Sequence, residues 1–415
     1  MATKSKAWKL RESLREKGQF WTPEWVAQPM AEYVLSQQSD EIFDPAVGAG
    51  AFFLAAKRIA KKTGIKIGLS GREIDKSALK SAMDNGLTKC DLRNVILRDF
   101  ILAPPRSKYK AIIANPPYVR HHRIPFKMKA ELKAFGLVTT GKIFDGRAGL
   151  QLYFFIRCLE RLEINGRLAF IVSADICEGV YAHKLWDWVK RNYCLDAVIT
   201  FDESATPFPA LDTNPIIIFI RNSNPQNEIG WARCIKPSKI ALSRWIKSGF
   251  TRNDIEGIYT ERRSLEEAVG TGLSRPINLD GNTKFRLGDF AKVMRGIVTG
   301  ENSFFFLTKD RVKELGIPEE YWLKAVGRTR DIPGNELTNE VLRKLENTGR
   351  PTMLLSIGKT RYDDMPISLQ KYLKYGEELG LDKKKLISTR SPWYRLETRK
   401  VPHFLFSYLG RRNSR

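Results

Sequence analysis

Four residues after a short apolar run could do chemistry on an amino group. Residues 109–114 lead directly into Asn115-Pro116-Pro117-Tyr118. Two prolines end a strand and stiffen the turn, because each fixes φ and lacks an N–H. The Asn115 amide oxygen and a nearby backbone carbonyl could then accept both hydrogens of an exocyclic NH2 group. Tyr118 offers a flat face for stacking on a base. A rigid strand-ending turn would explain the prolines, but not the asparagine or the tyrosine.

A glycine-containing turn further upstream is typical of a small-ligand site. Residues 44–50, Asp-Pro-Ala-Val-Gly-Ala-Gly, lie between a strand-like and a helix-like run. Gly48 and Gly50 permit positive φ and a close approach of a ligand to the backbone. The dinucleotide pattern GxGxxG is not matched, because Phe53 stands at the third glycine, and no phosphate-loop lysine follows. A pyrophosphate ligand is therefore not expected, and the turn alone could simply be a tight strand–helix connection.

Acidic residues end three consecutive strand-like runs. They are Asp44, Glu73 and Asp99, and the last is followed by Phe100. Open α/β sheets bind ligands at the carboxyl ends of their strands, where Glu73 could bind ribose hydroxyls. Asp99 could accept from an adenine amino group while Phe100 stacks on its ring. Each acid alone could be a helix cap or a solvated turn residue, but the row as a whole favours a nucleoside ligand without a pyrophosphate.

The elements that must position these residues alternate between β-like and helix-like runs. Several β-like runs are continuously apolar, which fits strands buried on both faces. The β-like runs are residues 41–46, 65–74, 95–100, 109–114, 167–173, 196–201 and 215–221, and the helix-like runs are 51–62, 76–85, 150–163 and 183–192. The alternation predicts an α/β fold with a doubly wound, mostly parallel, seven-stranded sheet.

A polar, turn-rich stretch at residues 221–230 predicts a domain boundary, because the alternation fails beyond it. The sequence therefore predicts two domains, 1–225 and 226–415, the second of mixed α+β structure. Residues 226–415 carry 36 basic and 23 acidic side chains, so both parts of the chain are basic.

Composition bounds the function class. The 415 residues carry a formal net charge of +24, which suits a polyanionic partner such as nucleic acid, although many basic proteins use charge only for solubility. No apolar run is long enough for a transmembrane helix and no secretory signal is recognisable, so no membrane partner is expected. Five scattered cysteines without metal-ligand spacing argue against disulfides and a metal site, and we expect a cytoplasmic location.

The ordered set of motifs resembles the gamma group of N6-adenine DNA methyltransferases. That group has a GxxxTP segment, the glycine turn, the acid-ended strands, the NPPY turn and then a target-recognition domain. This sequence has them in the same order, beginning with residues 18–23. The resemblance covers residues 17–221 and implies a class I methyltransferase fold. It also implies S-adenosylmethionine as methyl donor and no metal.

The resemblance further implies roles for individual residues. Thr22 and Asp44 would lie near the methionine part of the donor, in a turn that includes Ala46, Gly48 and Gly50. Glu73 would bind the ribose, and Asp99 and Phe100 the adenine. Phe208 matches a position that stacks on a flipped-out adenine, although it could equally be an ordinary core residue. The sequence departs from the family pattern at Gly149-Leu150-Gln151, where Asp-Leu-Tyr is frequent, so we assign no role there.

The second part of the chain is also similar to family segments. Its most specific piece is RGxxTG at residues 295–300, and it implies DNA binding through Arg295, Thr299 and Gly300. The alternative is a mixed domain with a solvated basic face. Relatives usually continue beyond such an ending, so truncation and an unusually short chain both stay open.

The sequence therefore predicts a site-specific adenine-N6 methyltransferase acting on double-stranded DNA, by base flipping and direct transfer. It would protect a genome against a partner restriction endonuclease, since no nuclease pattern is found in this chain. Two alternatives stay open. One is an RNA adenine-N6 methyltransferase, and the other is a non-catalytic nucleic-acid-binding protein with the same fold.

Overall fold

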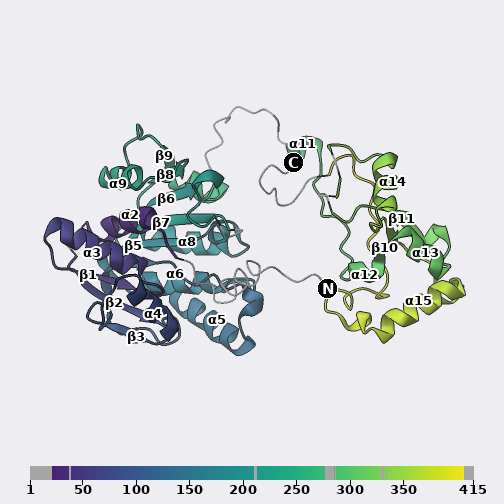
Figure 1. Ribbon diagram of the computed structural model, residues 1–415, viewed down its shortest axis with the longest axis horizontal. Coiled ribbons are helices and arrows are strands. Elements are labelled where there is room, and N and C mark those ends of the chain that lie inside the picture. The colour runs from purple at the N-terminus through teal and green to yellow at the C-terminus, as the bar shows by residue number, and fades with distance from the viewer. Residues whose placement is uncertain are drawn as a thin grey trace. The chain divides into compact units, whose positions relative to one another are not determined.

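The computed structural model describes residues 21–36, 39–209, 213–275, 285, 287–328, 331–332 and 334–405. The chain divides into two compact units, Met1–Gly281 and Asn282–Arg415 (Figure 1). In the described part of the chain, no helix is long and apolar enough to cross a membrane. Residues 18–20 of the GxxxTP segment and the last ten residues of the chain lie outside the described residues.

Unit 1 alternates strands and helices in the predicted way. Its strands are β1 (Glu41–Asp44), β2 (Gly68–Glu73), β3 (Val95–Leu97), β4 (Tyr109–Ala114), β5 (Leu162–Ser173), β6 (Cys194–Phe201), β7 (Pro215–Arg221), β8 (Glu228–Cys234) and β9 (Ile258–Ser264). Its helices are α2 (Glu24–Leu35), α3 (Ala51–Thr63), α4 (Lys76–Asp84), α5 (Phe126–Thr140), α6 (Leu150–Glu160), α7 (Asp175–Glu178), α8 (Ala182–Asn192), α9 (Lys239–Lys247) and α10 (Leu265–Thr271), with short 3-10 turns at His121–Arg123 and Glu203–Ala205.

The strands of unit 1 form one mostly parallel sheet of nine strands in the order β3-β2-β1-β4-β5-β7-β6-β8-β9. Strands β3, β2, β1, β4 and β5 run parallel to one another, whereas β7 is antiparallel to both β5 and β6. The seven predicted strands are all present, which confirms the predicted fold class. Chain order reverses direction between β1 and β4, and this is where open α/β sheets bind ligands.

Two strands beyond the predicted seven extend the sheet. β8 pairs in parallel with β6, and β9 pairs antiparallel with β8. Charged residues interrupt both strands, with Glu228 and Arg233 in β8 and residues 261–263 in β9, so they lack the continuous apolar runs of the central strands. The first unit therefore ends at Gly281 and not at residue 225, because β8 and β9 bury Ile229, Trp231 and Ala232 within it.

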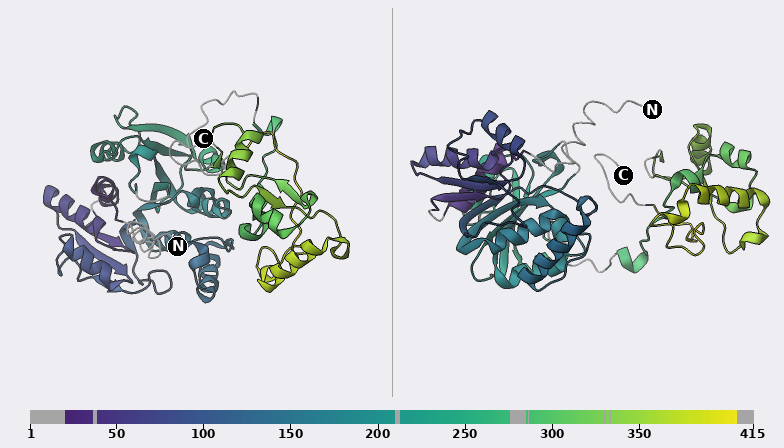
Figure 2. Two further views of the ribbon diagram at one scale, coloured as in Figure 1. Left: turned by 45° about the vertical axis from the view of Figure 1, so that its right-hand side comes forward. Right: turned by 90° about the horizontal axis from the view of Figure 1, so that it is seen from below.

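Helices cover both faces of the sheet (Figures 1 and 2). Strand β7 shows why its run Ile216–Ile220 is continuously apolar. Ile216, Ile218 and Ile220 pack into one core with α6 and α8, while Ile217 and Phe219 pack into the other with α2, α3 and α9. Both faces of this strand are buried, and alternate residues supply each face.

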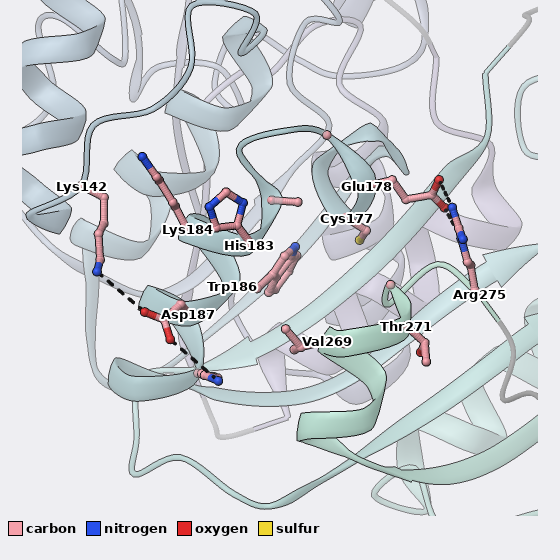
Figure 3. Close-up of a pocket in the computed structure, with 15 residues that line it drawn as sticks. Lys142, Cys177, Glu178, His183, Lys184, Trp186, Asp187, Val269, Thr271 and Arg275 are labelled. Carbon is pink, nitrogen blue, oxygen red and sulfur yellow. Dashed lines mark hydrogen bonds and ion pairs between the residues drawn. The ribbon is translucent and has the colours of Figure 1, made fainter. Parts of the chain in front are cut away.

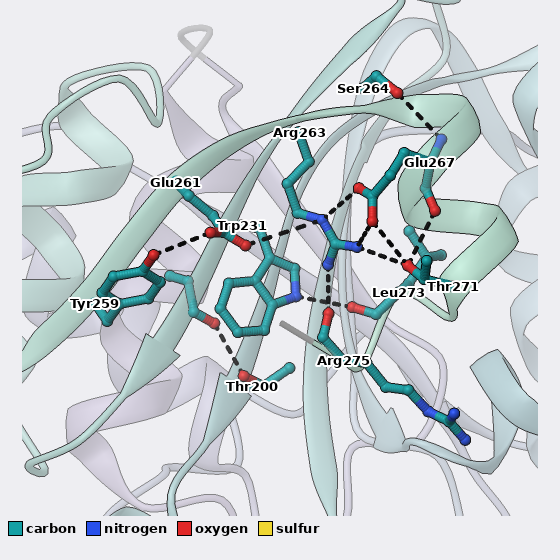
Figure 4. A network of polar contacts seen from close by, with 11 residues as sticks. Thr200, Trp231, Tyr259, Glu261, Arg263, Ser264, Glu267, Thr271, Leu273 and Arg275 are labelled. Atoms are coloured by element: carbon teal, nitrogen blue, oxygen red, sulfur yellow. Dashed lines mark hydrogen bonds and ion pairs between the residues drawn. The ribbon is translucent and has the colours of Figure 1, made fainter. Parts of the chain in front are cut away.

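A buried arginine fastens the end of unit 1 to its last strand (Figure 4). Arg263 in β9 donates to both carboxylate oxygens of Glu267, at 2.9 and 2.7 Å, and to the Thr271 hydroxyl at 2.8 Å. It also donates to the backbone carbonyl of Arg275. The indole N–H of Trp231 donates to the Leu273 carbonyl at 2.9 Å. These bonds satisfy the buried guanidinium and hold the segment that leaves unit 1.

Unit 2 is a smaller mixed α+β unit, as the sequence predicts. Its three-stranded antiparallel sheet has the order β10-β12-β11. The strands are β10 (Phe306–Leu307), β11 (Trp322–Lys324) and β12 (Met353–Leu355), and the helices are α11 (Leu287–Phe290), α12 (Asn302–Phe305), α13 (Lys309–Leu315), α14 (Asn339–Asn347) and α15 (Ile367–Glu378), with 3-10 turns at Glu319–Tyr321, Tyr362–Asp364 and Leu381–Lys383. Its separate core includes Phe304 stacked on Tyr372, with ring centroids 4.4 Å apart.

Candidate active site at the carboxyl edge of the sheet

The residues expected to do chemistry meet at one edge of the unit 1 sheet. Asp44 ends β1, Glu73 ends β2, and Asn115 directly follows β4. Asp99 lies two residues beyond β3. Because β3, β2, β1 and β4 are neighbouring parallel strands, their carboxyl ends share this edge. The structure therefore brings the acid row and the Asn115–Tyr118 turn together.

Asp44 is a buried carboxyl group at the centre of this edge. It is 1% exposed, and its Oδ1 accepts a hydrogen bond from the Ala46 amide at 2.9 Å. Oδ2 has no hydrogen-bond partner among the described residues. Burial raises the pKa of Asp44 to about 8, opposed by the Ala46 amide and aided by the charge of Glu73. An orphaned buried oxygen in this position suits a cationic or hydrogen-donating ligand.

Glu73 links the glycine turn to the next strand. Its Oε2 accepts from the Gly48 amide at 2.8 Å, and its Oε1 accepts from the amides of Ile74 and Asp75 at 2.8 and 2.9 Å. The carboxylate is thus oriented by three backbone donors. Each oxygen has two lone-pair directions, so Oε2 can also accept from a ligand hydroxyl.

The turn between β1 and α3 depends on its glycines. Gly48 and Gly50 have φ values of +54° and +82°, a region that other residues rarely adopt. At Gly50, an added Cβ would lie 2.4 Å from Cδ1 of Leu87. At Gly71 in β2, it would lie 2.5 Å from the Asp44 carbonyl oxygen. The backbone therefore approaches its neighbours closely at Gly50 and Gly71, where a side chain would not fit.

The asparagine of the second turn is fixed by a residue from the start of the chain. Nδ2 of Asn115 donates to Oγ1 of Thr22 at 3.0 Å, and Thr22 is 2% exposed. This contact turns the amide nitrogen, and not the oxygen, toward Thr22. Thr22 was expected near the donor through the family resemblance, and the structure adds a direct contact with the catalytic candidate.

Two aromatic residues meet beside the Asn115–Tyr118 turn. The rings of Tyr118 and Phe208 lie edge to face, with centroids 6.5 Å apart and an interplanar angle of 74°. Burial raises the pKa of Tyr118 well above its ordinary value, so the phenol stays neutral at physiological pH. Phe208 is 5% exposed and also packs with the core residues of one sheet face. Phe208 is therefore both a core residue and a neighbour of the Asn115–Tyr118 turn, so its position is compatible with either role.

Asp99 and Phe100 differ in how they are placed. Asp99 is half-buried, and its Oδ1 accepts from the Leu102 amide at 2.6 Å. Phe100 is 2% exposed and contacts Phe43 and Phe154, with centroids 5.8 and 5.6 Å away. Its ring is enclosed by the core and has little free face for a ligand. The position of Asp99 supports a ligand contact better than that of Phe100.

Gln151 is a buried polar residue to which the sequence assigned no role. It lies in the first turn of α6, which starts beside the Asn115–Tyr118 turn because the Leu150 amide donates to the Val119 carbonyl at 3.0 Å. Gln151 is 7% exposed, and its Oε1 has no partner among the described residues. Its position in place of the family tyrosine is the only sequence signal that pointed to it.

Comparison with known proteins decides the family. A model of the N-6 DNA methylase family matches residues 9–228, and a model of the C-terminal domain of the type II methyltransferase M.Eco57I matches residues 277–415. The first match covers more than half of the chain. The chain belongs to the N-6 DNA methylase family. Both units of the methylase are thus accounted for, and the motif-based resemblance is confirmed.

Several relatives of this methylase are type II methyltransferases. M.AccI of Acinetobacter calcoaceticus is 25% identical over 96% of this chain and 72% of its own length. M.XamI of Xanthomonas campestris pv. amaranthicola is 26% identical over 95% of this chain and 72% of its own length. These relatives support a DNA methyltransferase of a restriction-modification system.

Solved structures share the fold of the methylase. The type IIL restriction-modification enzyme MmeI, solved in a complex with DNA, aligns with a TM-score of 0.54 at 14% identity over 93% of this chain and 53% of its own. The type IIG restriction endonuclease BpuSI aligns with a TM-score of 0.52 at 16% identity over 95% and 50%. The fold is that of the class I methyltransferases.

The expected DNA-binding residues of unit 2 fall into two groups. Arg295 is exposed. Thr299 is 7% exposed, and its hydroxyl donates to the Asn302 side chain. Gly300 has a φ of +82°, and an added Cβ would lie 2.8 Å from Ile387. Thr299 and Gly300 therefore shape the turn, and Arg295 is the member of the motif that can reach a partner directly.

A surface hollow of about 740 Å³ lies elsewhere on unit 1 of the methylase (Figure 3). Residues of α7 and α8 and the segment after α10 line it, including Trp186, Glu178 and Arg275. None of the predicted site residues is among them. In the described part of the chain, no group of His, Cys, Asp and Glu side chains could hold a metal ion.

Proposed function

We propose that this methylase transfers a methyl group from S-adenosylmethionine to N6 of an adenine in double-stranded DNA. The target base would be flipped out of the helix, because an enzyme cannot reach it inside the base stack. The observation that carries the proposal is the anchored Asn115–Tyr118 turn, which shares the sheet edge with Asp44 and Glu73.

The residues at this edge fit the proposed donor. The orphaned Oδ2 of Asp44 suits the positively charged methionine part. Gly48 leaves room beside it, because an added Cβ there would come no closer than 3.7 Å to a described atom. The residues proposed to hold the donor are Thr22, Asp44, Ala46, Gly48, Gly50, Glu73, Asp99 and Phe100. Phe100 is buried in the core, so it would contribute by packing beneath the site. When bound, S-adenosylmethionine supplies an electrophilic methyl group on a sulfonium sulfur.

Asn115 and Pro116 would activate the adenine amino group. The N6 lone pair is delocalised into the ring, which makes the amine a poor nucleophile. The Asn115 side-chain oxygen and the Pro116 carbonyl would accept its two hydrogens and give the nitrogen sp3 character. The same oxygens stabilise the positive charge that develops on N6, which is preorganised electrostatic catalysis. Pro117 keeps the turn rigid, and the contact with Thr22 holds the amide in one orientation.

Tyr118 and Phe208 would receive the flipped base. Their rings lie edge to face, so one face can stack on a base while the other closes the side of the pocket. Stacking on an aromatic ring contributes about 1–3 kcal/mol per base, which offsets part of the cost of unstacking. Neither side chain acts as a nucleophile, and no covalent intermediate is required.

Replacing Asn115 by alanine tests this assignment. We expect methyl transfer from labelled donor to duplex DNA to fall by about a hundredfold to a thousandfold, the scale for a preorganised oxyanion-type contact. Donor affinity, measured by calorimetry, should stay within about threefold, because Asn115 acts on the base. Asn192→Ala serves as the control, since Asn192 is exposed on α8 and bonds only its own helix at 2.7 Å. Full activity of Asn115→Ala would overturn the proposal.

Expression in a host without DNA methylation would separate the proposal from its alternatives. Mapping modified adenines in that host reports the base, the strand and the target sequence together. Methyl transfer to RNA and not to duplex DNA would favour an RNA methyltransferase. Donor that binds but is never transferred would favour a non-catalytic nucleic-acid-binding protein.

The proposed partners follow from the family. Unit 2 would contact duplex DNA, with Arg295 reaching the DNA while Thr299 and Gly300 hold the turn that presents it. A cognate restriction endonuclease is the second proposed partner, because the relatives belong to type II restriction-modification systems. Protection of host DNA from that endonuclease by this chain alone would test the assignment.

A further inference from the structure

A strongly basic segment follows the catalytic turn directly. Residues 120–129 contain four Arg or Lys, two His and no acidic residue. Arg120 and Lys127 are exposed, and Lys129 is half-buried. None of these three forms an ion pair with another described residue. By contrast, the nearby Arg147 and Lys142 pair with Asp145 and Asp187, at 2.8 and 3.7 Å. The positive charges of Arg120, Lys127 and Lys129 are therefore not neutralised by an ion pair within the described part of the chain.

The basic segment is held beside the active site. The excursion of residues 120–149 starts at the catalytic turn and returns to it, because the Leu150 amide donates to the Val119 carbonyl at 3.0 Å. Ile124 is 5% exposed and anchors the segment in the core. The basic side chains of residues 120–129 thus lie on an ordered segment, next to the place where the target base would enter.

Helix α5 holds the far end of the basic segment in place. Its inner face packs through Leu132 and Gly136, and an added Cβ on Gly136 would lie 3.1 Å from the Phe144 ring. Phe126, the first residue of α5, faces away and is 89% exposed. A large exposed aromatic ring among arginine and lysine side chains is typical of surfaces that contact nucleic acid.

We propose that residues 120–129 bind the DNA strand next to the target adenine. Arg120, Lys127 and Lys129 contact its phosphates, and the Phe126 ring packs against a neighbouring sugar or base. The positive charges of these three side chains have no ion-pair partner among the described residues, so they suit a polyanion. Because the segment lies beside the catalytic turn, that polyanion would be the DNA strand that carries the target adenine. This inference rests on the proposed function.

A pair of double variants tests the phosphate contacts. Arg120→Glu with Lys127→Glu reverses two charges in the segment. Lys61→Glu with Lys62→Glu makes the same change at the end of α3, where both lysines are exposed at the opposite edge of the sheet. Binding of a fluorescent DNA duplex would be measured by anisotropy at several salt concentrations. Each lost phosphate contact should make the slope of log K against log salt shallower by about 0.9.

We expect the Arg120/Lys127 variant to bind DNA at least about tenfold more weakly, with a slope reduced by about 2. The Lys61/Lys62 variant should keep its slope. Equal losses in the two variants would mean a general charge effect and would overturn the proposal. Unchanged DNA binding by the Arg120/Lys127 variant, with an altered sedimentation coefficient, would assign the surface to a second protein copy and would also overturn it.

Phe126→Ala tests the apolar contact separately. It should weaken DNA binding by about fivefold with the salt slope unchanged, because no phosphate contact is lost. Val138→Ala is the control, since Val138 is 86% exposed at the other end of the same helix. Equal DNA affinity of the Phe126 variant and the unaltered protein would remove Phe126 from the contact and overturn that part of the proposal.

The same measurements separate this inference from the proposed function. If the unaltered protein methylates duplex DNA while the Arg120/Lys127 variant binds DNA normally, only the inference fails. If the unaltered protein neither binds nor methylates duplex DNA, the proposed function fails first. Donor affinity should be equal in all variants, because the basic segment lies outside the donor turn.

Discussion

Asp44 is a carboxyl group of the candidate site that is almost completely shielded from solvent. Its carboxyl group is buried, and its pKa is raised to about 8. An aspartate in the unfolded chain has a pKa of about 4. Between these values the folded chain binds a proton that the unfolded chain does not, so stability contributed by Asp44 is lost as pH rises from about 4 to 8.

Replacing Asp44 by asparagine should remove this pH dependence. We expect the variant to gain stability relative to the unaltered chain between pH 5 and 9, on the order of a few kcal/mol at the upper end. Urea unfolding of the chain at several pH values measures it. Asp254→Asn, at an exposed carboxylate, should leave the profile unchanged. If the free energy of unfolding varied with pH in the same way for the Asp44 variant and for the unaltered chain, the raised pKa of Asp44 would be contradicted.

Residue types predicted which side chains meet at this edge of the sheet, but not all of their contacts. Asp44, Glu73 and Asn115 lie at the sheet edge because each ends or follows a parallel strand, which a local pattern can indicate. The bond between Asn115 and Thr22 joins residues 93 positions apart, so no local pattern could predict it. The burial of Phe100 likewise depends on Phe43 and Phe154, which come from other strands and helices.

At the scale of the element, the β1–α3 turn is shaped by backbone conformation. Gly50→Ala combines a φ of +82° with a Cβ placed 2.4 Å from buried Leu87. We expect it to destabilise unit 1 by about 2–4 kcal/mol and to weaken donor binding. Gly64→Ala has a similar φ of +73° but open space around its Cβ, so it should cost only about 1 kcal/mol. Equal losses in denaturant unfolding would contradict the steric role of Leu87.

Hydrogen bonds from the buried Arg263 side chain join β9 to α10. Arg263→Met should destabilise unit 1 by about 3 kcal/mol, because Glu267 and the Arg275 carbonyl lose their shared donor (Figure 4). Arg262→Met provides a neighbour on the same strand, where the arginine only pairs at the surface with Glu228 at 3.2 Å. That variant should lose less than about 1 kcal/mol in chemical denaturation. Similar losses in both would show that burial of Arg263 contributes nothing.

Elements were predicted best where their sequence pattern is local. The continuously apolar runs of several central strands specify burial on both faces, and a strand is present in each of the seven predicted runs. β8 and β9 were assigned to the second domain instead, because a polar turn precedes them and charged residues interrupt both strands. Their place in the sheet is decided by pairing with β6, which the sequence pattern does not reveal.

For the whole molecule, the two units have no hydrophobic core in common among the described residues, which predicts two unfolding steps. Unit 1 contains the two cores of the large sheet, and unit 2 has its own core around Phe304 and Leu373. Scanning calorimetry should therefore show two transitions. Saturating donor should raise the midpoint of only one, since a ligand at about a hundred times its Kd stabilises its own unit by about 2.7 kcal/mol. A single transition that shifts as a whole would contradict independent units.

The net charge of +24 is also a property of the whole molecule. Residues 282–415 carry 27 basic and 16 acidic side chains, so the excess is shared between the two units and does not lie in one tail. A charge spread over both units fits a partner that contacts both. The basic segment at residues 120–129 gives part of this excess a definite place beside the Asn115–Tyr118 turn.

The sequence by itself determined the order of motifs, the alternation of strands and helices, and the family that these imply. Each of these depends on neighbours in the chain, namely apolar runs, glycine and proline conformations, and acids at strand ends. Tertiary structure alone decided where the first unit ends, which residue orients Asn115, and that Arg263 is buried and Arg295 exposed. These features depend on contacts between segments far apart in the chain, whose free energies are set by packing and burial and not by local conformation.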